Sequence, residues 1–295
     1  MKIWVVVMLA GCDSATLDLE PETSNDACYS LDACAMATGT DLRTMSVVRS
    51  DDTEGVGLDA VYLDTLDVVS VTSDRTGATF HAIAPGLAHV HAKMGDYAMD
   101  STLRVADIAT TNLQLLRPAV VAAPPMIAAF PATELLVQAQ YFDLRGNPLV
   151  GHGVEDWALT GGVVQQQYDF QTYGEDSALM QFVSITGDAE LSAHGATLSV
   201  KQVPFGSTAS ISLGQDALTI QRQIAGVFIL MAKTADGLSI YGDAPATLTS
   251  SDPTIATADI SARRVSVTPH APGSTTLTIV FDGAQLVLPV TVTQQ

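Results

Sequence analysis

Basic residues are scarce in this 295-residue sequence, which has 13 Lys and Arg against 32 Asp and Glu and a formal net charge of −19 at pH 7. A surface that binds nucleic acid has to neutralise phosphates with Lys and Arg. Attachment to anionic lipid headgroups by charge also needs basic residues. We therefore expect no nucleic-acid partner, and any membrane attachment has to come from a source other than surface charge.

Familiar catalytic motifs are missing as well. The chain has no Gly-x-Ser-x-Gly, no His-Glu-x-x-His and no Gly-Lys-Ser/Thr phosphate-binding loop. Residues 55–60 match Gly-x-Gly-x-x-Ala, but acidic residues surround them and no strand-to-helix pattern follows, which argues against a dinucleotide site. We predict a non-enzymatic protein that carries no cofactor.

The apolar run at the N-terminus is too short to cross a membrane as a helix. It extends from Ile3 to Ala10 behind Lys2, far below the ~20 residues that a transmembrane helix needs, and it matches the positive and apolar regions of an export signal. The run ends in Leu9-Ala10-Gly11-Cys12, which resembles the lipobox of bacterial lipoproteins, whose cysteine is lipidated before cleavage. The alternative is cleavage by the ordinary signal peptidase beside an incidental cysteine.

Lipidation of Cys12 would supply the membrane attachment that an acidic surface cannot, because two or more acyl chains hold a protein stably. The resemblance therefore implies a bacterial cell-envelope protein with a lipid anchor. Asp13 resembles the inner-membrane retention signal of enteric bacteria. Other phyla do not reliably follow that rule, so the choice between inner membrane, outer membrane and cell surface stays open.

Cysteine is rare, and its odd count is informative. The three cysteines are Cys12, Cys28 and Cys34, and lipidation of Cys12 accounts for the unpaired one. Cys28 and Cys34 can form a disulfide in an oxidising compartment, worth about 2 kcal/mol for so small a loop. Two free thiols are the alternative. Residues 12–34 are rich in acids and Ser/Thr, so we expect a flexible, disordered tether there.

From about residue 35 the sequence shows no sustained helical period. Short runs of Val, Thr, Ile and Leu alternate with Gly, Pro, Asp and Asn, a pattern that predicts β-strands and turns. An internal repeat supports this. Ala84-Pro85-Gly86 recurs as Ala271-Pro272-Gly273, and the same shift of 187 residues aligns the alternating apolar positions on both sides.

The second copy predicts a hairpin with a defined register. Asp282-Gly283 is a favoured two-residue turn, since both residues tolerate positive φ, and it fixes which residues lie opposite each other. In the first copy Gly95-Asp96 takes the same place, and Ser101 is the one polar residue on the expected core face. The expected pairs are Phe281 with Ala284, Ile279 with Leu286, Leu277 with Leu288, Met94 with Tyr97, Ala92 with Met99, and Val90 with Ser101.

Three segments of the last copy together resemble the bacterial Ig-like domain group 2. They are Ser250-Ser251-Asp252-Pro253, the Val-rich residues 265–268, and Ala271-Pro272-Gly273 leading into an alternating strand. The first copy lacks the Ser-Ser-Asp-Pro segment. This resemblance implies Ig-like β-sandwiches.

We therefore predict an all-β chain of tandem Ig-like β-sandwiches after a lipoprotein signal peptide and a flexible tether. The expected boundaries are 1–11 for the signal peptide, 12–34 for the acidic tether, 35–107 for a first Ig-like domain, 108–203 for a divergent second one and 204–295 for the third. The middle assignment rests on a strand that ends at Asp143 and turns through Gly146-Asn147-Pro148.

Candidate ligand-binding residues are few. In the predicted register His89, His91 and Asp100 share the outward face, a set that can bind a transition metal; a solvated face with one polar cross-strand pair is the alternative. Acidic clusters could bind calcium but lack the spacing of a calcium loop. These clusters are Asp51-Asp52-Thr53-Glu54 and Asp59 with Asp64 and Asp67. Trp157, the only Trp after the signal, fits a core strand rather than a glycan platform.

These observations favour a lipid-anchored envelope protein whose Ig-like modules act as a spacer and as an interaction or adhesion surface. The partner would be a protein or a surface glycan. A calcium- or glycan-binding surface module is the alternative, and an envelope enzyme with an unrecognised site comes third, because a fold alone never excludes a site.

Overall fold

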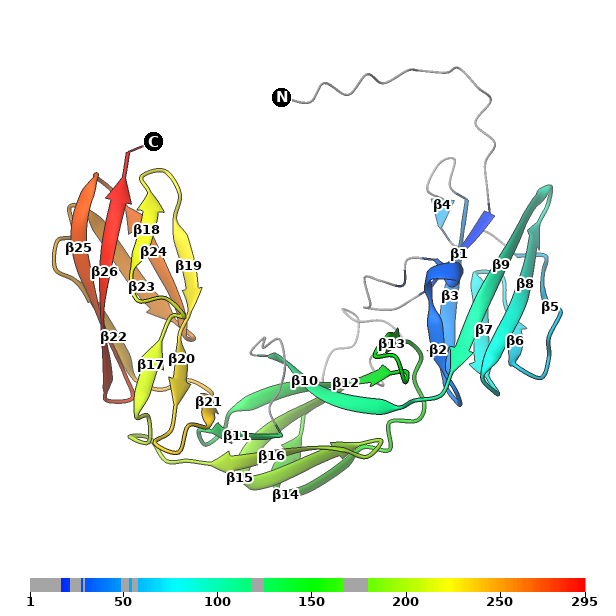
Figure 1. Cartoon of the computed structure of the whole chain (residues 1–295), viewed down its shortest axis with the longest axis horizontal. Coiled ribbons are helices and arrows are strands. Elements are labelled where there is room, and N and C mark those ends of the chain that lie inside the picture. The colour runs from blue at the N-terminus through cyan, green and yellow to red at the C-terminus, as the bar shows by residue number, and fades with distance from the viewer. Residues whose placement is uncertain are drawn as a thin grey trace. The chain divides into compact units, whose positions relative to one another are not determined.

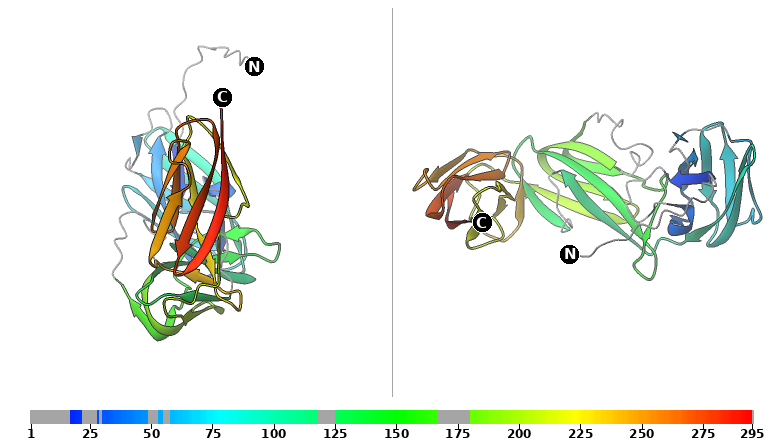
Figure 2. Two further views of the ribbon diagram at one scale, coloured as in Figure 1. Left: turned by 90° about the vertical axis from the view of Figure 1, so that its left-hand side faces the viewer. Right: turned by 90° about the horizontal axis from the view of Figure 1, so that it is seen from above.

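The computed structural model describes residues 17–21, 28, 30–48, 53–54, 58–117, 125–166 and 180–294. Nearly all the regular structure in these ranges is β-strand, and η1 (Leu31–Ala33) is the only helix among them. The strands form layered, mostly antiparallel sandwiches (Figures 1 and 2), which confirms the predicted all-β fold. In the described part of the chain no helix is long and apolar enough to span a membrane.

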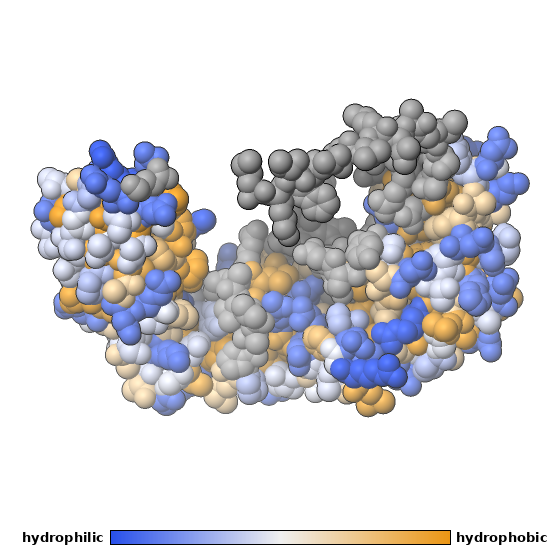
Figure 3. Space-filling view, turned by 45° about the horizontal axis from the view of Figure 1, so that its top comes forward, coloured by the Kyte–Doolittle hydropathy of each residue, from blue (hydrophilic) through white to orange (hydrophobic). Residues whose placement is uncertain are grey.

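The described residues divide into two compact units. The first contains those of Met1–Thr111 together with Gln140–Glu155, and the second those of Asn112–Ala139, Asp156–Tyr168 and Met180–Gln295. Hydrophilic residues interrupt the hydrophobic ones over the face shown in Figure 3, as expected for sheets that bury only one side.

The first unit holds one sandwich, here called the first module. One sheet has the order β1-β3-β7-β6, with β4 beside β3, and the other has the order β2-β9-β8-β5. Phe80, Leu103 and Met36 are fully buried between them. The strands are β1 (Leu17–Pro21), β2 (Ala35–Ala37), β3 (Asp41–Val48), β4 (Thr53–Glu54), β5 (Ala60–Leu63), β6 (Val69–Ser73), β7 (Gly77–Ala82), β8 (Gly86–Met94) and β9 (Tyr97–Ala106).

The flexible tether expected over residues 12–34 is wrong for the part of that segment that the structure describes. Leu17–Pro21 pairs antiparallel with β3 as strand β1, and Leu19 is completely buried. Further along, Leu31 in η1 is buried in the same core. Leu-Asp-Leu-Glu has the period of two that a half-buried strand requires, and the acidic composition obscured that period.

The second unit is built around one large sheet. Its order is β10-β12-β15-β16-β11-β21-β20-β17, with β13 beside β12 and β14 beside β15. The strands are β10 (Thr110–Arg117), β11 (Met126–Ala129), β12 (Glu134–Phe142), β13 (Pro148–Leu149), β14 (Ala158–Gln165), β15 (Met180–Ala193), β16 (Ala196–Gln202), β17 (Ser210–Ser212), β20 (Met231–Lys233) and β21 (Ser239–Tyr241). The pairing of β13 with the end of β12 lies within the first unit.

The last module completes its sandwich with two further sheets, β18-β26-β25-β22 and β19-β24-β23. Their strands are β18 (Leu218–Gln221), β19 (Gly226–Ile229), β22 (Ala246–Ser250), β23 (Ala256–Ser261), β24 (Arg264–Pro269), β25 (Gly273–Phe281) and β26 (Ala284–Thr293). The large sheet enters this module where β11 pairs in parallel with β21. Phe130 is fully buried there and its ring lies 6.2 Å from that of Phe281. A strand of the middle module thus pairs with a strand of the last one, while residues 203–209 connect β16 to β17.

Both predicted hairpin registers are confirmed. Phe281 lies opposite Ala284 and Leu277 opposite Leu288, while Val90 lies opposite Ser101 in the first module. Asp282 and Gly283 both have positive φ, at 50° and 86°, which is the backbone geometry that an Asp-Gly hairpin turn adopts.

The internal repeat holds at the level of single atoms. A Cβ added at Gly86 would lie 2.8 Å from Val68, and one added at Gly273 would lie 2.8 Å from Ile255, the residue equivalent to Val68. The backbone N–H groups of Ile83 and Ala84 both donate to the Val68 carbonyl, and those at the equivalent positions 270 and 271 both donate to the Ile255 carbonyl. In both copies the glycine of the Ala-Pro-Gly triplet thus lies at the start of a strand, in close contact with an aliphatic side chain that precedes it in the chain.

We expect Gly86→Ala to lower the free energy of unfolding by about 1–3 kcal/mol, because the new methyl group overpacks this contact. Urea denaturation of the purified chain measures the loss. Val68→Ala removes the clashing methyl groups, so the double variant should be more stable than the sum of the two single effects requires. Strict additivity would show that the contact with Val68 is not the cause.

Candidate functional site

Of the three cysteines, the structure describes Cys28 and Cys34. Cys12 and Asp13 lie outside the described residues. Cys28 and Cys34 are joined by a disulfide, with their Cα atoms 4.8 Å apart, within the usual range for such a bond. Both cysteines are buried. The disulfide closes a short loop, the disulfide loop (described residues 28 and 30–34), which packs against strand β9.

Asp32 is held at the edge of β9 by this loop. Its Oδ1 accepts hydrogen bonds from the Ser101 hydroxyl at 2.5 Å and from the Thr102 backbone N–H at 2.6 Å. The Ser101 bond, followed by the Thr102 bond, lowers the pKa of the Asp32 carboxyl below its ordinary value. Ser101, the polar exception on the core face of the hairpin, therefore has a structural role as a donor to this carboxylate.

His91 lies between two carboxylates on the outer face of the same sheet. Its Nδ1 is 2.5 Å from Asp100 Oδ1, and its Nε2 is 3.2 Å from Asp64 Oδ2. The Tyr62 ring stacks on the imidazole, with centroids 4.8 Å apart. Because only the protonated ring donates from both nitrogens, the bonds to Asp100 and then Asp64 raise the pKa of His91 above its ordinary value.

The structure brings together only part of the predicted metal set. His91 and Asp100 are in contact, whereas His89 Nδ1 lies 3.4 Å from the Thr102 hydroxyl. A metal on His91 would have to displace one of its carboxylate partners. Among the described residues no three His, Cys, Asp or Glu side chains converge in a way that could hold a metal ion.

The acids considered for calcium are divided between other partners. Asp59 Oδ2 accepts from the Gly95 N–H at 2.6 Å, and Asp64 faces His91. Asp51 and Asp52 lie outside the described residues. Calcium binding thus stays a prediction from sequence, with no converging set in the described ranges to support it.

Asp143 is a buried carboxylate whose role the sequence did not reveal. It fixes the turn at residues 144–147 and contacts Arg104. Asp143, 7% exposed, accepts from the Arg145 N–H, from the backbone and side-chain amides of Asn147, and from Arg104 at 3.1 Å. The two Asn147 bonds, ahead of Arg104, lower the pKa of Asp143 strongly. The Asp-x-x-Gly-Asn-Pro turn was visible in the sequence, but its contact with Arg104 was not.

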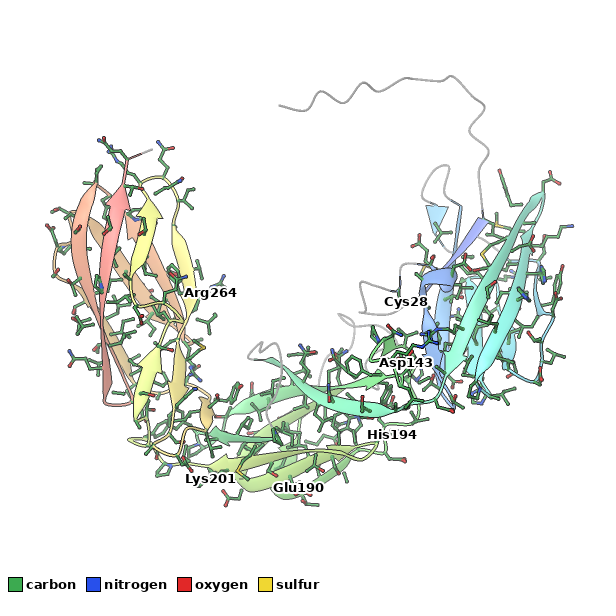
Figure 4. All side chains as sticks on the ribbon, viewed as in Figure 1. Cys28, Asp143, Glu190, His194, Lys201 and Arg264 are labelled. Atoms are coloured by element: carbon green, nitrogen blue, oxygen red, sulfur yellow. A yellow bond between two sulfur atoms is a disulfide. The ribbon has the colours of Figure 1, made fainter. Side chains whose placement is uncertain are left out.

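Two adjoining cavities lie along this face. One, of about 670 Å³, lies between the disulfide loop, Arg104 and the turn at Asn147-Pro148. The other, of about 390 Å³, is lined by His89, His91, Asp64 and Asp100. Both have Asp32 and Thr102 in their walls, so they adjoin, and together they are here called the β9 groove. Figure 4 labels Cys28, which lines the groove, and Asp143, which holds Arg104.

The β9 groove presents polar side chains and one aromatic ring. The Thr102 hydroxyl and His89 Nδ1 are the nearest approach to a nucleophile and base, but in the described residues no carboxylate orients the other His89 nitrogen. Trp157 is only half-buried before β14, so the expected burial is incomplete. Tyr62, 56% exposed, is the aromatic residue that this face presents.

We expect the His91 ring to titrate above the ordinary value of about 6.5 in an NMR titration of the whole chain. Asp100→Asn removes the largest cause of the shift, so the midpoint should move down. In the unaltered chain the protonated His91 stabilises the first module. This contribution is fully present below the unfolded-state pKa of His91 and is lost as pH rises through its raised folded-state pKa. An identical midpoint in both proteins would contradict the proposed pairing.

Comparison with known proteins yields only distant matches. No family model matches the chain, and neither does any curated protein. Among solved structures, domains 4–9 of the surface layer protein SbsC match 94% of this chain at 12% identity and a TM-score of 0.30, and this chain spans about half of that one (49%). The Escherichia coli adhesin FdeC matches 95% of this chain over 96% of its own length, at 14% identity and a TM-score of 0.25. An endo-fucoidan hydrolase of glycoside hydrolase family 107 matches 94% of this chain over 45% of its own, at 13% identity and a TM-score of 0.27. These scores are too low to indicate a shared function.

Proposed function

We propose that this chain is a lipid-anchored protein of the bacterial cell envelope whose Ig-like modules serve as a spacer and an interaction surface, without enzymatic activity. The observation that carries the proposal is the lipobox-like Leu9-Ala10-Gly11-Cys12 placed directly before a series of β-sandwiches. The Cys28–Cys34 disulfide supports export, because disulfides persist in oxidising compartments.

The position of β1 sharpens this proposal. The strand begins at Leu17, so only residues 13–16 separate it from the lipidated Cys12. At ~3.5 Å per residue, such a segment reaches about 15 Å. The anchor would thus hold the first module against the membrane surface, instead of letting it move on a long tether. A chain this acidic would be repelled by anionic headgroups, so the acyl chains have to supply the whole attachment.

The group 2 Ig-like assignment of the last module is part of the same proposal. In the Ser250-Ser251-Asp252-Pro253 segment, Asp252 Oδ1 accepts from the backbone and hydroxyl of Thr254, at 3.0 and 2.6 Å. The Asp252 N–H donates to the Thr275 hydroxyl at 2.9 Å. The Thr275 bond ties the segment to β25 and the Thr254 bonds fix its turn, which gives Asp252 of the motif a physical role and supports the resemblance.

We expect Cys12→Ser to abolish labelling by a radioactive fatty acid and to release the chain from the membrane fraction without unfolding it. Cys28→Ser with Cys34→Ser is the matched control, because it removes the other two cysteines and their disulfide but leaves the anchor, and this variant should stay labelled and membrane-bound. Labelling, fractionation and a thermal melt of each variant measure the effect. Membrane retention of an unlabelled Cys12→Ser chain would show that another contact anchors the protein.

A further inference from the structure

The outward face of the β9 groove can be compared with the equivalent face of the last module. Strands β25 and β26 of the last module repeat β8 and β9 with the same register, so each outward residue of the groove has a counterpart 187 positions later. The counterparts are Thr276 for His89, Thr278 for His91, Val287 for Asp100, Pro289 for Thr102 and Thr291 for Arg104. The sandwich therefore forms with uncharged residues at all five positions, and the charged set of the first module is not required by the fold.

The two walls of the groove are held by specific covalent and hydrogen bonds. The disulfide loop is fixed by Cys28–Cys34 and by the two bonds to Asp32. The opposite wall is the Asn147-Pro148 turn, fixed through Asp143 to Arg104. A groove whose polar groups are already held in place loses little conformational entropy when a ligand binds.

The groups that remain open in the groove are of mixed type. Arg104 uses one terminal nitrogen on Asp143, and its remaining N–H groups are donors. Asp32 Oδ2 and Asn147 Oδ1, which accept none of the hydrogen bonds found within the described residues, are acceptors. Leu87, 55% exposed, and Pro148 supply apolar contact between them. Hydroxyl groups, each both donor and acceptor, match such an alternating set.

Other ligand classes fit less well. The carboxylates of Asp32, Asp64 and Asp100 face the groove and repel phosphate, sulfate or uronate groups. A single metal ion finds no three converging ligands in the described chain. An extended peptide would need a free strand edge. In β9 one edge is paired with β8, and along the other edge β2 pairs with Arg104–Ala106 while Asp32 occupies the Thr102 N–H.

We propose that the β9 groove of the first module binds an uncharged or amino-bearing saccharide chain, with Arg104, Asp32, Asn147 and His89 contacting its hydroxyl groups. This inference rests on the proposed role of the modules as an interaction surface and names the ligand class. It places the recognition in the first module alone, since the last module presents Thr, Val and Pro on the corresponding face.

The test uses the full-length chain in mild detergent on a printed array of uncharged, amino-bearing and acidic oligosaccharides. We expect binding to uncharged or amino-bearing glycans, and weaker or no binding to acidic ones. Calorimetric titration with the best-bound soluble glycan then gives the affinity. His89→Thr with Arg104→Thr installs the residues of the last module, and Asp32→Asn keeps the loop contacts but reverses one acceptor. Each variant should weaken binding about tenfold or more.

Asp96→Asn, in the turn of the same hairpin but outside the groove, is the matched control and should bind as the unaltered chain does. Urea denaturation confirms that each variant is folded. Preferred binding of acidic glycans, no binding to any glycan on the array, or full affinity in both groove variants would overturn the inference. None of these outcomes touches the lipid anchor, which the Cys12→Ser experiment tests separately.

Discussion

The β8–β9 hairpin buries one face and exposes the other, and this constraint decides where His89, His91, Asp100 and Arg104 lie. Val90, Ala92 and Leu103 enter the core, so the residues between them have to face outward. A slip of one residue would exchange the two sets. The same constraint operates on β25 and β26, where the outward positions carry little chemistry. The fold therefore fixes which positions face outward, and it tolerates different residue types at those positions.

Most of the acidic residues with well-defined contacts serve the backbone. Asp74 accepts from Thr76 and Gly77, Asp188 from Gln202, and Asp282 from Gly206 and Thr208. The pKa of Asp74 falls to about 2 for this reason, with the Thr76 backbone bond as the largest cause. Each carboxylate satisfies N–H groups that a turn would otherwise leave to water. The large acid count thus overstates the number of carboxylates free to bind cations.

Features set by local sequence patterns could be predicted from the sequence. The hairpin registers followed from Asp282-Gly283 and alternation, and the opposition of His91 to Asp100 followed from the register. The groove could not be foreseen, because Asp32, Arg104 and Asn147 meet only through contacts between distant segments. The pairing of β11 with β21 was equally hidden, since parallel strands so far apart in the chain leave no turn signal. In strand β1 the acidic composition masks the period of two that predicts a strand.

The parallel pairing of β11 with β21 bears on how the second unit transmits force. A peptide linker between sandwiches acts as a swivel, and a pull on one sandwich reorients it before the other responds. Here Ala128 and Ala129 are hydrogen-bonded into the strand that carries Ile240 and Tyr241, and Phe130 and Arg263 contact the ring of Phe281 beneath it. The middle and last modules are consequently joined by backbone hydrogen bonds and by packing around Phe281 as well as by the chain itself, so a load on β21 is shared with β11 instead of being borne by a single covalent connection.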